Sequence, residues 1–236
     1  MTTTHFTNGV SNQTVGDPLY DYPYLDPFKF YSYVNDFFTY HASEWTITTT
    51  EAGTGSATEA LTSQAGGALL VTNAAGDNDL DFFNLKGESF KFVSTKRMFF
   101  KAKFKVNDAT QSDVVMGLTI TDTTPLDTTD GIFFQKDDGD ANIDFYVEKN
   151  NAASSKTAIG TLVNDTFITV AFVYEPSGNS GSGSFSIYMD DARVGEETTL
   201  TNVPDDEELT IAFGIQNGAA AAKTMTIDYI ICAVER

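Results

Sequence analysis

The sequence of 236 residues contains one cysteine, one tryptophan and two histidines. A single cysteine, Cys232, forms no intrachain disulfide and no cysteine-based metal cluster. Because Cys232 lies in a short apolar run, we interpret it as a small core residue of a strand. Both histidines, His5 and His41, precede the strand-rich part of the chain. A histidine-dependent nucleophile needs a rigid scaffold and a hydrogen-bonded partner, so these positions argue against that class of catalysis and against three-histidine zinc sites.

Basic side chains are also scarce, with 14 Lys and Arg against 33 Asp and Glu, which gives a net charge of −19. Proteins hold phosphate groups with clustered Lys and Arg, so this balance argues against nucleic acid and anionic lipid as partners. No apolar run approaches the ~20 residues that a membrane-spanning helix needs. We therefore expect neither a nucleic acid nor a membrane partner, and no motif indicates a nucleotide cofactor.

Alternation of apolar and polar residues is the dominant pattern after Trp45. In Arg97–Val106, the aromatic and aliphatic residues fall on one face of an extended chain and three lysines fall on the other. This period of two predicts a strand with one buried and one solvated face. Similar runs occur at 68–72, 80–84, 90–93, 114–121, 132–136, 143–148, 167–174, 185–189, 209–215 and 225–234.

These runs are rich in β-branched and aromatic residues, and Gly, Asn, Asp and Ser fill the joints between them. No segment has the apolar period of a stable helix. More than ten short strands at this spacing predict an all-β fold, a sandwich of two antiparallel sheets. We expect one body domain over residues 45–236.

Residues 1–44 differ from this body and are predicted to form an extended N-terminal arm. Three prolines favour extended or turn conformations, and the segment has many aromatic residues but only one basic residue. Disordered segments are poor in aromatics, so an arm that lies on a surface fits this composition better. The aromatic residues predicted to anchor the arm on a partner are Tyr20, Tyr22, Tyr24, Phe28, Phe30 and Tyr31. Deleting residues 1–40 is expected to leave a folded body.

Half of the basic residues lie between positions 86 and 105, beside a single acid, Glu88. The favoured interpretation is that these basic residues form a solvated sheet face, whose charges also protect a sheet edge from pairing with another chain. The alternative is that the stripe docks an acidic partner, such as the arm of a neighbouring copy. The residues predicted to form this basic stripe are Lys96, Arg97, Lys101, Lys103 and Lys105.

The abundant acids form no recognisable catalytic set. A retaining glycosidase on a sandwich needs two carboxylates about 5 Å apart, which alternate residues of one strand commonly supply, and no Glu-x-Asp-x-Glu pattern occurs. The alternating oxygen-bearing side chains of the segment 138–144 resemble the start of an EF-hand calcium loop; they are Asp138, Asp140, Asn142 and Asp144. The sixth position of that loop requires glycine, and here it is Ile143. We predict no enzyme activity, no catalytic residues, and at most an adventitious Ca²⁺ at Asp138, Asp140 and Asn142.

The sequence also resembles two known groups of proteins. The opening Thr4–Val10, and Phe37–Tyr40 followed by Glu44–Ile47, resemble decoration proteins of tailed-bacteriophage virions. Segments within the body resemble strands of a concanavalin A-like (laminin-G-like) jelly roll. Those segments are 131–137, 185–195 and 209–215.

The phage resemblance implies a virion structural protein that is made in the host cytoplasm and cements the capsid surface without catalytic residues or cofactors. The implied partners are the major capsid protein and sister copies in a dimer or trimer. The alternative is a lectin-like carbohydrate-binding module that serves host adsorption or acts alone. This alternative predicts an exposed aromatic platform, for which Tyr146, Tyr174 and Tyr188 are the candidates.

Overall fold

The structure, a computed structural model, describes residues 29–176 and 183–236. Within these residues the chain forms two antiparallel sheets, each of eight strands. The first sheet contains, in spatial order, β12 (Ala152–Thr161), β11 (Asn142–Lys149), β10 (Gly131–Lys136), β9 (Ser112–Thr119), β16 (Glu208–Asn217), β6 (Leu80–Leu85) and β3 (Trp45–Thr50), with β7 (Phe90–Lys91) also paired to β16. The second contains β15 (Ala192–Glu197), β14 (Ser184–Met189), β13 (Ile168–Glu175), β8 (Met98–Val106), β17 (Thr224–Glu235), β5 (Leu69–Thr72) and β4 (Thr58–Leu61), with β2 (Phe30–Asn35) also paired to β17.

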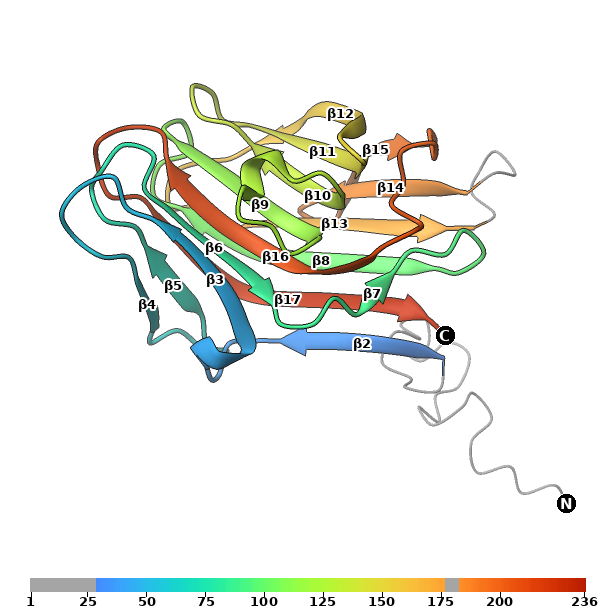
Figure 1. Ribbon diagram of the computed structural model, residues 1–236, viewed down its shortest axis with the longest axis horizontal. Helices are drawn as coiled ribbons and strands as arrows, with labels where there is room; N and C mark the ends of the chain where they lie inside the picture. Colours follow the sequence, from blue (N-terminus) through green and yellow to red (C-terminus); the bar gives the residue numbers. More distant parts are fainter. Residues whose placement is uncertain (1–28, 177–182) are drawn as a thin grey trace, which may run out of the picture.

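The two sheets face each other as layers of a sandwich (Figure 1), which confirms the predicted all-β architecture. Burial along β8 alternates residue by residue, with Phe100, Ala102 and Phe104 in the core and the intervening lysines on the outer face. Every predicted run from 68 to 234 coincides with a strand of the structure. Period-two patterning located these strands because a sheet that is buried on one side imposes that period on the sequence.

The central strands of the first sheet are buried on both faces. All eight residues of β9 are buried, as are most residues of β6 and β16. On the outer face, Phe82, Val115 and Phe133 form a second apolar cluster with Leu80 and Ala212, and Leu126 and Tyr146 pack against it. Leu126 belongs to η3 (Pro125–Asp127) in the β9–β10 connection, so this connection covers part of the sheet.

The sandwich begins earlier than the predicted residue 45. Strand β2 pairs antiparallel with the last strand, β17, and Figure 1 shows the two side by side. Phe30 and Phe37 are fully buried in the core region. Deletion of residues 1–40 would remove a paired strand and two buried aromatic side chains, so the structure argues against the expectation that this deletion leaves a folded body.

Helical structure in the described residues is limited to η3 and to η2 (Ala42–Glu44), each a single 3₁₀ turn. No helix there has the length and apolar character needed to cross a membrane.

Phe213 offers a direct test of the core. Its ring stacks on Phe83 at a centroid distance of 4.8 Å and meets Trp45 edge-on at 5.1 Å. Phe213→Ala should lower the free energy of unfolding by about 3–5 kcal/mol, because it leaves a cavity among these rings. The matched control Val194→Ala, at a 40% exposed position, should change it by less than about 0.5 kcal/mol. Urea denaturation measures both, and equal effects of the two substitutions would contradict the assigned core.

Candidate functional site

The outer face of β10 and β11 combines an aromatic pair with a row of polar side chains. Phe133 of β10 lies opposite Tyr146 of β11, and their rings stack with a centroid distance of 5.5 Å and an interplanar angle of 15°. A Cβ at Gly131 would come within 2.7 Å of the Phe133 ring, so glycine is what allows that ring to lie close to the sheet. Asp144 and Glu148 precede and follow Tyr146 on the same face of β11, because alternate residues of a strand share a face.

A depression of about 200 Å³ lies beside this row, where the β10–β11 turn approaches β12. The turn closes through Gly139 at a φ of +95°, and the pairing of β11 with β12 is shifted between Ile143 and Phe145. The side chains and backbone that line the depression come from Asp137, Asp138, Asp140, Asn142, Asp144, Thr157 and Ala158.

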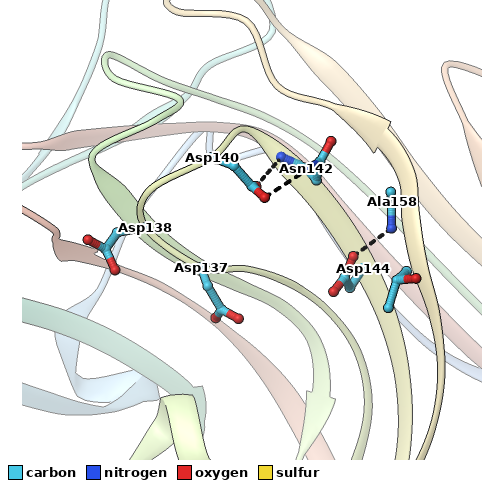
Figure 2. A pocket seen from close by; sticks show the side chains of 7 residues that line it. Asp137, Asp138, Asp140, Asn142, Asp144 and Ala158 are labelled. Atoms are coloured by element: carbon cyan, nitrogen blue, oxygen red, sulfur yellow. Dashed lines mark hydrogen bonds between the residues drawn. The ribbon is translucent and has the colours of Figure 1, made fainter.

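Three of these carboxylates accept hydrogen bonds from neighbouring groups of the protein; Asp137 accepts one from the Gln135 side chain at 2.7 Å, and Figure 2 shows the other two. Asp140 accepts hydrogen bonds from the backbone N–H of Asn142 at 2.7 Å and from its side-chain amide at 3.0 Å. Asp144 accepts one from the N–H of Ala158 at 2.7 Å. Its second oxygen accepts a longer one from the Tyr146 hydroxyl at 3.4 Å. These contacts hold the polar groups of the depression in place next to Tyr146.

A buried lysine lies close to the acidic turn. Lys136 is 1% exposed, and its ammonium group donates hydrogen bonds to the carbonyl oxygens of Thr110, at 3.0 Å, and Ser112. Burial lowers the pKa of Lys136, although the nearby carboxylates of Asp113 and Asp138 oppose this shift. Burial also raises the pKa of Asp113, which accepts the N–H of Asp138. One positive charge therefore offsets part of the negative charge at this end of the sheet.

Burial, with the carboxylates of Asp127 and Asp130 nearby, raises the pKa of Glu148 at the other end of the polar row. Asp130 is itself held by the N–H of Asn150 and the hydroxyl of Thr129. The face can thus offer both carboxylate acceptors and, at Glu148, a carboxyl group that protonates more readily than an exposed one.

The predicted calcium residues Asp138, Asp140 and Asn142 all line the depression, but their oxygen atoms are not arranged as a metal centre. The Asp140 carboxylate is occupied by Asn142, and in residues 29–176 and 183–236 no three acidic, histidine or cysteine side chains are grouped to hold a metal ion.

The lysines of the basic stripe on β8 lie on the outer face of the second sheet, and three of the five stripe residues form ion pairs within the chain. Arg97 pairs with Glu235 at 3.4 Å, Lys101 with Asp191 at 2.5 Å and Lys103 with Asp228 at 2.6 Å. The Lys105 ammonium lies 5.1 Å from the centre of the Phe167 ring, and the N–H of Lys96 donates to the Val93 carbonyl. β8 lies between β13 and β17, so the prediction that the stripe protects a sheet edge is wrong.

Of the predicted arm anchors, Tyr20, Tyr22, Tyr24 and Phe28 fall outside the described residues. Phe30 is fully buried in β2, and Tyr31 stacks near Phe90 with a centroid distance of 6.0 Å, so both contact the chain's own sandwich.

The three tyrosines proposed as a glycan platform are placed differently. Tyr174 is 1% exposed and its hydroxyl donates to the Ser94 carbonyl, so it is a core residue. Tyr188 lies on β14 of the second sheet, opposite Arg193. The Tyr146 hydroxyl donates to Asp144, one of the residues that line the depression. Sequence patterning did not single it out because alternation does not say which face of a strand is covered.

No protein-family model and no curated protein sequence matches the chain. Several solved structures share its fold. An endo-1,3-β-glucanase from Streptomyces sioyaensis superposes with a TM-score of 0.61 at 10% identity, over 87% of this chain and 96% of that one. The potassium-bound Emp46p carbohydrate recognition domain gives 0.56 at 14% identity, over 84% and 94%. Peanut lectin gives 0.55 at 12% identity, over 87% and 97%. This likeness establishes a concanavalin A-like jelly roll, as predicted.

Lys136→Met tests the buried support beneath the depression. The substitution leaves the Thr110 and Ser112 carbonyls without their charged donor, so it should lower the free energy of unfolding by about 1–3 kcal/mol. Lys86→Met, at an exposed position, is the matched control and should have almost no effect. Chemical denaturation of both variants checks this, and an unchanged stability of Lys136→Met would contradict the role given to Lys136.

Proposed function

We propose that the chain is a carbohydrate-binding protein that takes a neutral glycan on the outer face of β10–β12. The observation that carries this proposal is the half-buried Tyr146 ring, whose hydroxyl donates to Asp144, a fixed carboxylate that lines the depression. A sugar ring presents an apolar face to an aromatic side chain and hydroxyl groups to polar acceptors. The structural neighbours include a carbohydrate recognition domain, a lectin and a glucanase, which supports this proposal over capsid binding.

A neutral ligand suits the charge of this surface. The depression carries Asp137, Asp138, Asp140 and Asp144, and the protein as a whole has a net charge of −19. An acidic polysaccharide would be repelled, whereas the hydroxyl groups of a neutral sugar can donate to the carboxylates.

The proposed activity is binding without cleavage. Asp144 and Glu148 share a face of β11 but are four residues apart, which places them about 13 Å apart along a strand. Glycosidases need their two carboxylates about 5–9.5 Å apart, so this row does not match either geometry of hydrolysis.

Capsid decoration, with the capsid protein and sister copies as partners, stays a prediction from the sequence resemblance. Four of its six proposed anchor residues lie outside the described residues, and its basic stripe is paired within the chain. A chain that begins at residue 29 keeps β2, so it is the suitable comparison with the full chain. Loss of binding to expanded capsids on this truncation would support decoration by the arm.

Tyr146→Ala tests the glycan proposal. A glycan array should identify neutral oligosaccharide ligands for the full chain, and calorimetry with one of them should show affinity for the variant weakened by at least about tenfold, or about 1.4 kcal/mol. Tyr188→Ala, on the other sheet, removes the same side chain away from the site and should leave affinity unchanged. Equal affinities for Tyr146→Ala and the wild type, or an absence of any glycan ligand, would count against the proposal.

A further inference from the structure

Strand β12 carries a bulge directly beside the depression. In its pairing with β11, Lys156 lies opposite Phe145 and Gly160 lies opposite Ile143. Asp144 is therefore the single residue of β11 that faces residues 157–159, which we call the β12 bulge. A bulge bends its strand and redirects the side chains that it carries, and bulges are frequent beside functional sites.

The β12 bulge contains a residue with a strained backbone. Ala158 has a φ of 51°, in the left-handed region. This conformation is unfavourable for any residue that has a Cβ atom. Burial does not enforce it, because Thr157 and Ala158 are both exposed. A specific contact must therefore hold Ala158 in this conformation.

That contact comes from the residue opposite the bulge. The N–H of Ala158 donates to Asp144 Oδ1 at 2.7 Å (Figure 2). A bulge interrupts the hydrogen bonds between two strands, and here a side chain supplies the acceptor for the freed N–H. The second oxygen of Asp144 accepts the Tyr146 hydroxyl at 3.4 Å. Asp144 thus joins Tyr146 to the part of β12 that lines the depression.

Both ends of the β12 bulge are held by the rest of the sandwich. Lys156, just before it, pairs with Glu197 of β15 at 3.5 Å. At its other end, Ile159 packs against the core, and a Cβ at Gly160 would overlap the Met189 side chain. The position of the exposed middle, Thr157 and Ala158, therefore depends on Asp144.

We propose that Asp144 is a positioning residue of the glycan site, which keeps the β12 bulge in the strained form that walls the depression. This inference rests on the proposed function of the same face. Both oxygens of Asp144 already accept hydrogen bonds from the protein, so Asp144 acts on the glycan through Ala158 and Tyr146. The role requires a hydrogen-bond acceptor at Oδ1 and does not require a negative charge.

Three variants separate this role from direct contact with the glycan, with calorimetry against the neutral oligosaccharide that the array selects. Asp144→Ala removes the acceptor and lets Ala158 relax, so affinity should fall by about five- to tenfold. Asp144→Asn keeps an oxygen acceptor and should bind within about twofold of the wild type. In the Asp144→Ala chain, Ala158→Gly should recover most of the lost affinity, because glycine adopts the left-handed conformation without strain. A carboxylate that contacted the glycan directly would not be replaced by glycine at position 158.

Hydrogen exchange of the Ala158 amide, followed by NMR, tests the same contact without any glycan. Exchange should be slow in the wild type and in Asp144→Asn, and at least about tenfold faster in Asp144→Ala. The matched control is Asp140→Ala, which removes another carboxylate of the depression, one held by Asn142. This control should leave exchange at Ala158 unchanged. Thermal unfolding of each variant verifies that it is folded.

Equal exchange at Ala158 in the wild type and in Asp144→Ala would overturn the proposal. A double variant that binds the oligosaccharide no better than Asp144→Ala would also overturn it. The two possible failures are distinguishable. Glycan binding that Asp144→Ala leaves unchanged removes the role of Asp144 and keeps the proposed function. A wild-type chain without a glycan ligand removes the proposed function, and exchange at Ala158 then decides alone whether Asp144 holds the β12 bulge.

Discussion

The structure depends on one constraint, the burial of aromatic rings between two sheets. Phe172 of β13 in the second sheet meets Phe134 and Phe145 of the first sheet with centroid distances of 6.3 and 5.7 Å. At the other end, Phe213 stacks on Phe83 and meets Trp45 and Phe37 edge-on. Such rings bury large areas and interlock in preferred geometries. A shift of one residue in any of these strands would point its aromatic rings toward the solvent. The buried layer of rings therefore fixes the register of strand pairing.

The same constraint decides what remains for function, because only the outer faces and the sandwich edges can carry polar groups. On the outer face of the second sheet, basic residues form ion pairs within the chain, as Lys103 of β8 does with Asp228 of β17. The outer face of the first sheet differs, since a second apolar cluster covers its centre and leaves Tyr146 at the boundary with the acidic depression. The excess negative charge therefore lies at turns and rims, where it influences which ligand can approach.

Sequence patterning found the strands whose alternation is strong, such as β8, and missed those with weak signals. β12 reads Ala-Ala-Ser-Ser-Lys-Thr-Ala-Ile-Gly-Thr and is mostly exposed at a sheet edge, so burial imposes little pattern on it. β2 was assigned to the arm because its aromatic residues continue a Pro-rich segment, and its pairing with β17 joins residues about two hundred positions apart. The candidate site could not be derived for a related reason. The strand register places Tyr146 opposite Phe133, and the connection that contains η3 covers the neighbouring part of the sheet. Both are properties of the assembled sheet, which the alternation within one strand does not reveal.

The proposal that the outer face of β10–β12 binds a glycan can be tested by mapping where the ligand contacts the chain. The most direct measurement is an NMR titration, in which a neutral oligosaccharide ligand is added to the isotope-labelled full chain. The changes in the amide chemical shifts of assigned residues are then recorded. The account predicts that the largest shifts fall on the β10–β11 turn, around Tyr146, and on β12 near Ala158. If the shifts instead gather on β8, β13 and β17 of the second sheet, the site is misplaced and the claim is contradicted.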